Sequence, residues 1–234
     1  MKFSKAILIG AMVGATSLFA EEATQKTAWI SQDFENQEYF SKVSPTGFTA
    51  RNPKTGLWSQ FKNDGVLTIS DEQAASGSYA LKHTQFPAPA RYFANWIFPT
   101  PLSESFVFEA YINMEVGARS VIGLVTEYNG KKERRFSFGA FDPKANNMAY
   151  LDYKANKWMR SGIKIANDEW VKVQLEYDAT AQTVSYYVFI DDVKEKIGEV
   201  SAENLGTVNF VEFRHNASEN GKAVYIDDVK IFKK

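Results

Sequence analysis

Four aromatic residues have the chemistry needed to bind a sugar. Trp158 and Trp58 lie in turn-like stretches rich in Gly, Ser and Lys, and Trp96 follows Tyr92 in a segment flanked by prolines. A flat ring stacks on the apolar face of a pyranose, while nearby polar groups pair with its hydroxyls. We therefore take all four as candidate carbohydrate-binding residues. The alternative for each tryptophan is a place in the core or under a loop, because tryptophan is usually highly buried.

Charged residues within otherwise apolar runs form a second group of candidates. In a strand over residues 208–215, Glu212 and Arg214 would share one face, and the apolar residues between them would share the other. Arg135 alternates with phenylalanines in the same way, and Arg119 could join this group. The planar donor fork of Arg suits hydroxyl or carboxylate recognition, so Arg135 and Arg214 are also candidate carbohydrate-binding residues. Alternatively, these arginines lie on a solvated outer face.

Enzyme signatures are mostly missing from the sequence. It contains no Gly-x-Ser-x-Gly, no His-Glu-x-x-His, no phosphate-binding Gly-rich loop and no Glu-x-Asp-x-x-Glu. Only His83 and His215 could serve a histidine-based mechanism. Glycoside hydrolysis needs two acids about 5–9 Å apart across a cleft, and a chain with 28 acidic residues leaves that possibility open.

Period-2 alternation of apolar and polar residues predicts the elements that carry these candidates. The runs recur about every ten residues, the spacing of a sandwich or barrel, and helical periodicity is weak. Because proline cannot donate to a ladder, the prolines around Trp96 predict a short edge strand or a long loop there. The expected strands cover residues 66–70, 79–83, 106–114, 120–128, 134–141, 148–153, 171–177, 184–190, 208–215 and 223–232.

Several segments resemble known β-sandwich families. Residues 170–178, Trp-Val-Lys-Val-Gln-Leu-Glu-Tyr-Asp, are similar to a hairpin motif of laminin-G-like and concanavalin-A-like jelly rolls. The stretches at 33–35, 76–82 and 224–229 resemble elements common in β-sandwich carbohydrate-binding modules. The resemblance covers most of residues 30–232 and implies an all-β, two-sheet antiparallel jelly roll with little helix.

The resemblance also implies a structural calcium ion. In such modules the first and last strands lie together, and acidic residues from both can meet carbonyls of the Ser-Gly-Ser turn. Calcium favours six to eight hard oxygen ligands. Carried over residue by residue, the ligands would be Glu35 and Asp227, with Asp33 and Ser78 as further candidates. The alternative is that the acidic pair at 227–228 only forms an exposed bulge.

The first twenty residues have the pattern of a signal peptide. Lys2 and Lys5 precede an apolar run that ends at Ala20 and is too short to span a bilayer. We expect a signal peptide at 1–20, a polar lead at 21–28 and one jelly-roll domain at 29–234. Because the chain has no cysteine, disulfides and Cys-ligated metal sites are excluded. The absence of cysteine and the short signal favour a secreted or periplasmic bacterial protein without a membrane span after cleavage.

The composition limits the classes of molecule that the protein is expected to bind. With two lysines lost from 27 basic residues, the 28 acidic residues give a net charge of −3, which argues against nucleic-acid binding. The sequence therefore predicts a secreted, non-catalytic polysaccharide-binding domain. Two alternatives are a glycoside hydrolase or Tyr/Arg lyase of the same fold, and a cell-surface structural or adhesion domain, since one sandwich hosts many functions.

Overall fold

The computed structural model describes residues 27–35, 49–52, 56–59, 67–84, 92–118, 120–128, 131–140, 147–203, 206–215 and 222–234. These residues form sixteen strands and no helix. Accordingly, no described segment is a helix long and apolar enough to cross a membrane.

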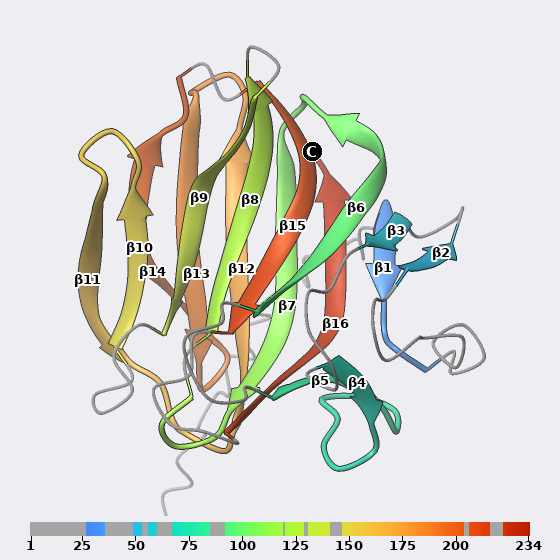
Figure 1. The fold of residues 1–234 in the computed structure, drawn as a ribbon. Coiled ribbons are helices and arrows are strands. Elements are labelled where there is room, and N and C mark those ends of the chain that lie inside the picture. Colours follow the sequence, from blue (N-terminus) through green and yellow to red (C-terminus); the bar gives the residue numbers. More distant parts are fainter. Residues whose placement is uncertain are drawn as a thin grey trace, which may run out of the picture.

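The strands form two antiparallel sheets of eight strands each, stacked face to face (Figure 1). The first sheet contains, in spatial order, β14 (Val193–Ser201), β13 (Thr183–Ile190), β12 (Trp170–Asp178), β7 (Phe106–Met114), β16 (Ala223–Lys233), β5 (Ala80–Thr84) and β4 (Leu67–Ser70), with β1 (Ile30–Gln32) also paired to β16. The second contains β11 (Lys157–Lys164), β10 (Asn147–Asp152), β9 (Lys131–Ala140), β8 (Ser120–Tyr128), β15 (Thr207–His215), β6 (Tyr92–Leu102), β3 (Gly56–Ser59) and β2 (Thr49–Asn52).

This architecture confirms the all-β jelly-roll prediction. Each of the ten predicted runs is a strand, with ends that differ by at most three residues. The first and last strands also lie together, as the resemblance implied, because Gln32 pairs with Val229 and Ile30 with Ile231.

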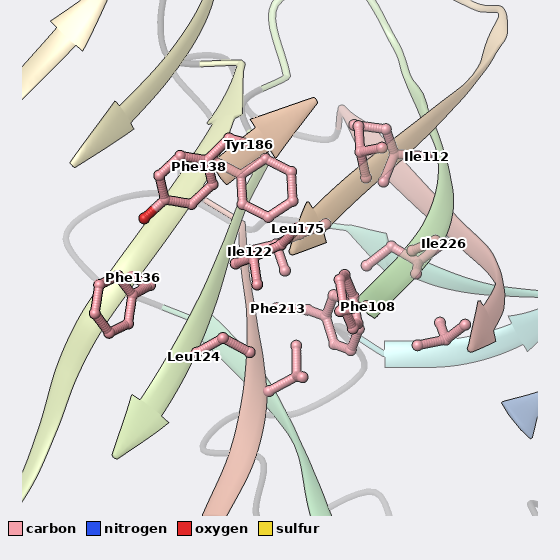
Figure 2. Close-up of a cluster of buried hydrophobic side chains, with 14 of the residues drawn as sticks. Phe108, Ile112, Ile122, Leu124, Phe136, Phe138, Leu175, Tyr186, Phe213 and Ile226 are labelled. Carbon is pink, nitrogen blue, oxygen red and sulfur yellow. The ribbon is translucent and has the colours of Figure 1, made fainter. Parts of the chain in front are cut away.

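Alternation along each strand builds the core between the sheets. On β12, Val173 and Leu175 are fully buried in the core cluster, while the intervening residues face outward. The facing strands contribute aromatic rings such as Phe138 and Phe213. Figure 2 shows these side chains filling the space between the sheets. Strand β13 is flanked by β12 and β14.

A glycine helps to close one open side of the sandwich. A Cβ at Gly198 of β14 would lie 2.1 Å from the ring of Tyr150 on β10, so the ring occupies the space that a side chain would need. Tyr150 in turn stacks on Tyr186, with ring centroids 5.6 Å apart. This contact joins the end of the first sheet to the second.

The prediction for the proline-rich segment was wrong. Strand β6 is an eleven-residue strand paired on both sides, with β15 and with β3. Its register with β15 runs through Ile97 and resumes at Leu102, so the intervening residues lie in an irregular stretch. Pro99 and Pro101 fall in that stretch, where a ladder amide is not needed.

The turn-like contexts predicted for two tryptophans were also wrong. Trp58 lies within β3 and Trp158 within β11. Strand β3 has only four residues, and β11, at a sheet edge, carries polar residues on both faces, so neither shows clear period-2 alternation.

Candidate functional site

A loop before β5 meets two carboxylates from distant parts of the chain. Along one side of β16, β5 pairs with residues 223–226 and β1 pairs with residues 229–231. Between these pairings the register with β7 shifts, and Asp228 has a left-handed φ of 46°. The segment that follows β1 and the loop that precedes β5 therefore meet at Asp227.

Asp227 is fully buried and binds backbone amides. Its Oδ2 accepts N–H groups from Ala75 at 2.9 Å and Ser76 at 3.2 Å, and its Oδ1 accepts the N–H of Asp228 at 2.7 Å. Burial raises the pKa of Asp227 to about 6, although the three amide hydrogen bonds act in the opposite direction. The carboxylate thus fixes the start of the loop to the last strand.

Glu35 holds the other half of the same loop. Its Oε1 accepts N–H groups from Ser78 at 2.9 Å and Tyr79 at 2.8 Å. Between the two carboxylate contacts lies Gly77, with φ +62°, where a Cβ would come within 2.5 Å of Glu35 Oε1. A glycine is required here both for the left-handed backbone and for the close approach. We call residues 75–79 the clasped loop.

The structure brings together three of the four residues predicted to bind calcium. Glu35, Asp227 and Ser78 meet at the clasped loop, while Asp33 accepts the N–H of Glu35 at 3.2 Å and so caps a local turn. The carboxylate oxygens of Glu35 and Asp227 are hard donors of the kind that calcium prefers, and in this structure they accept backbone N–H groups of the loop. Within the described ranges, no group of three or more His, Cys, Asp and Glu side chains is arranged to hold a metal ion.

The outer face of the second sheet contains buried positions that do not belong to the core between the sheets. Gly123 on β8, Ser137 and Gly139 on β9, and Ala149 on β10 alternate with core residues and are buried. Because they point away from the first sheet, they must be covered from the outside. We call these four residues the small-residue floor.

Two polar side chains lie on either side of a glycine in this floor. Gly123 pairs with Ser137 on one side and with Glu212 on the other. Ser137 is 1% exposed and Glu212 is 4% exposed. The Ser137 hydroxyl has no hydrogen-bond partner in the described part of the structure. With neighbouring strands about 4.8 Å apart, the two Cα atoms are about 10 Å apart, with no side chain between them.

The edge strand β11 borders the floor. Register pairs Trp158 with Leu151, Arg160 with Ala149 and Lys164 with Asn147. These partners alternate with the core residue Met148 and with Tyr150, so Trp158, Arg160 and Lys164 share the outer face. Trp158 is half-buried, whereas Arg160 and Lys164 are exposed. We call these three residues the β11 row.

Five other predicted tryptophan, tyrosine and arginine sites have described backbone positions only. Trp96 pairs with Val211 and with Trp58, and Tyr92 pairs with His215. Arg214 pairs with Val121 and Phe93 on the second sheet, and Arg135 lies at the register shift between β8 and β9. The side chains of Trp96, Trp58, Tyr92, Arg135 and Arg214 are outside the described part of the structure, as is residue 119. Their roles stay predictions.

The sequence-based reasoning missed Ser137, Arg160 and Lys164. Ser137 sits between two phenylalanines that are both in the core, and this alternation was a usable signal. The cations of β11 were hidden because the strand itself was read as a turn. Glu212 was noticed as a polar residue in an apolar strand, and the structure places it at the floor.

Among the described strand residues around Glu212, no second acidic residue lies close to it. Glycoside hydrolysis uses two carboxylates about 5–9 Å apart. On β6, β8, β9 and β15, the residues within two positions of the Glu212 row include no other Asp or Glu. Close to Glu212, these strands thus supply no second acid, and Glu212 itself can accept hydrogen bonds from sugar hydroxyls.

Comparisons with known proteins show the fold. The sequence matches no protein-family model and no curated protein. Its structure is similar to a carbohydrate esterase of the Shiga toxin-encoding bacteriophage phi24B, with 11% identity over 89% of this chain and 99% of that chain (TM-score 0.60). A legume lectin-like domain from Entamoeba histolytica aligns with 7% identity over 72% of this chain and 90% of that chain (TM-score 0.53).

A much longer protein shares the same sandwich. A sialidase aligns with 12% identity over 89% of this chain (TM-score 0.59), and this chain spans only 19% of the sialidase's length. At these identities the similarities show the fold alone, a concanavalin-A-like jelly roll.

Proposed function

We propose that the chain is a secreted, non-catalytic carbohydrate-binding domain that takes a polysaccharide on the outer face of its second sheet. The observation that carries this proposal is the pair of buried polar side chains, Glu212 and Ser137, on either side of Gly123. A buried hydroxyl without a partner is costly unless a ligand or water completes it. Sugar hydroxyls can donate to the carboxylate and pair with the serine.

The fold supports the same proposal by analogy. Two of the similar structures carry carbohydrate-related names, an esterase and a legume lectin-like domain. Because the esterase belongs to a different class from the lectin-like domain, analogy alone does not separate binding from catalysis. The single acid near the floor favours binding.

A glycan array with the full chain and its Glu212→Gln variant tests this function. We expect the wild-type chain to retain one class of polysaccharide and the variant to lose about tenfold or more in affinity, because a charge-assisted hydrogen bond is lost. The variant should unfold at nearly the wild-type temperature, since Gln has the same shape as Glu.

Glu199→Gln is the matched control, because Glu199 lies on the outer face of the other sheet, where it pairs with Lys196. It should bind glycans like the wild type. Equal glycan binding by wild type and Glu212→Gln would contradict the proposed site. Release of sugar fragments from a retained polysaccharide would instead identify an enzyme.

We further propose that calcium binds at the clasped loop through Glu35 and Asp227, with Ser78 nearby. Bound calcium would supply charge compensation for Asp227, which is fully buried. Millimolar calcium should raise the melting temperature of chelator-treated protein by several degrees, through binding to the native state only. Magnesium is the control, because it prefers a tighter octahedral shell. An unchanged melting temperature in wild type would contradict the assignment.

A further inference from the structure

The strands of the two sheets differ in charge. Strands of the second sheet carry nine Lys and Arg residues against four Asp and Glu residues, a net charge of +5. Strands of the first sheet carry six basic and seven acidic residues, a net charge of −1. The whole chain has a net charge of −1, so its positive charge is concentrated on one layer of the sandwich.

The lysines of the first sheet are neutralised by neighbours. Lys172 binds Glu109 at 2.8 Å, and Lys196 binds Glu199 at 2.8 Å. Glu176 receives both Lys194 and Lys234, and Lys194 also lies 4.0 Å from the ring centroid of Tyr187. The charged side chains named here are therefore paired with neighbours on the same sheet.

Lys164 of the β11 row differs from these lysines. Lys164 is exposed and forms no ion pair in the described part of the chain, and neither does the exposed Lys157 at the start of the strand. Arg160 is exposed between them. Lys157 pairs with Asp152, which alternates toward the other face, so Arg160 and Lys164 are the cations that produce a local positive field along the edge of the small-residue floor.

Protection of a sheet edge does not account for this pattern by itself. Charged residues on edge strands discourage pairing with another chain. The corresponding edge of the first sheet, β14, uses Lys194, Glu195, Lys196 and Glu199, which balance one another. Strand β11 has cations alone, so its charge exceeds what the neighbouring edge needs for the same purpose.

We propose that the polysaccharide bound by this domain is acidic, and that its carboxylate or sulfate groups pair with Arg160 and Lys164 while a sugar ring stacks on Trp158. The inference rests on the function proposed above and specifies its ligand. Consecutive outward residues of a strand are about 7 Å apart, so the row follows an extended chain along β11. Arg offers a planar fork and Lys a point charge to such groups.

The buried acid at the floor is compatible with an acidic ligand. Glu212 lies on β15, four strand positions from β11. At about 4.8 Å per strand, it is about 19 Å from the cationic row. An anionic group held at β11 is therefore repelled little by the Glu212 carboxylate, because charges beyond about 10 Å are screened.

The test compares polygalacturonate with its fully methyl-esterified form, which has the same backbone without the charge. Affinity electrophoresis and calorimetry with the full chain should show at least tenfold tighter binding to the charged polymer. The preference should weaken as sodium chloride is raised from 50 to 300 mM. Alginate and dextran sulfate are the further arms that distinguish carboxylate from sulfate recognition.

The double variant Arg160→Gln/Lys164→Gln should lose about tenfold in affinity for the preferred acidic polymer, because two charge-assisted contacts are removed. Lys196→Gln, on the edge of the first sheet, is the matched control and should bind like the wild type. Equal binding of charged and neutral polymers, or an equal loss in the control, would overturn the inference.

The two proposals can fail separately. If neutral polysaccharides are bound as tightly as acidic ones and Glu212→Gln weakens both, the carbohydrate-binding function stands and the acidic ligand is wrong. If the chain binds no polysaccharide at all, both the proposed function and this inference are wrong.

Discussion

Two buried acids, Asp227 and Glu212, have different surroundings in this protein. Asp227 accepts three backbone amides, all from the clasped loop and its own strand. Glu212 lies across a glycine from a buried serine hydroxyl that has no partner in the described structure. The first acid organises the chain around it, whereas the second lies in the outer face of the second sheet, beside Gly123.

The carboxylate of Asp227 is fully hydrogen-bonded, whereas the hydroxyl of Ser137 has no described partner. This difference distinguishes a structural site from a site that points to a ligand. A fully hydrogen-bonded carboxylate stabilises one backbone conformation, and replacing it should cost stability. A buried hydroxyl without a partner costs stability and so points to a ligand. Mutations at the two sites should therefore change different measured quantities.

The largest expected effect is on stability, at the clasped loop. Asp227→Ala leaves the amides of Ala75, Ser76 and Asp228 without their acceptor, so the free energy of unfolding should fall by about 3 kcal/mol. Urea unfolding followed by circular dichroism measures it. Asp227→Asn, which keeps one acceptor oxygen, should lose less. If Asp227→Asn loses as much free energy of unfolding as Asp227→Ala, the loop depends on the charge of Asp227 and not on its hydrogen bonds.

Lowering the pH should stabilise the chelator-treated protein through Asp227. Burial raises the pKa of Asp227 to about 6 in the folded chain, above the value near 4 of an unfolded chain. Between these values the folded state binds the extra proton, so this contribution is fully present below pH 4 and is lost as the pH rises through 6. The stability of wild type relative to Asp227→Asn should therefore rise as pH falls from 7 to 5. A constant difference would contradict the raised pKa.

The smallest expected effects are at Ser137, where stability and affinity for the polysaccharide should change in opposite directions. Ser137→Ala removes a buried hydroxyl without a described partner, so the free energy of unfolding should stay unchanged or rise by up to about 1 kcal/mol. The affinity for the bound polysaccharide should instead fall about threefold, because one hydrogen bond to the ligand is lost. A loss of stability together with unchanged affinity would assign the serine to the fold.

Much of the fold could be predicted because each strand turns one face toward the core and the other away from it. The alternation of Val173 and Leu175 with polar neighbours on β12 is a direct consequence of burying one face against the core. The meeting of residues near 33 with residue 227 was predicted from resemblance, and the pairing of β1 with β16 confirms it.

The edge strands, the interruption in β6 and the surroundings of Glu212 could not be predicted, because the local sequence pattern does not show where a strand lies in its sheet. Strands β11 and β14 are edges, and their polar residues on both faces hide the alternation. Strand β6 keeps its prolines only because its ladder with β15 is interrupted at residues 98–101, a feature set by the partner strand. The position of Glu212 opposite a glycine likewise depends on a different strand, β8, which supplies Gly123.

The pairing of β1 with β16 has a mechanical consequence. Ile30 faces Ile231 in an antiparallel pair, and the amide of Trp29 also binds Ile231, so the chain leaves both strands at the same end. Tension applied through both exits would load these hydrogen bonds one after another, like a zipper, instead of sharing the load along the strand. Once β1 peeled away, Glu35 would leave Ser78 and Tyr79. A pull at the ends would thus open the clasped loop before it strained the core.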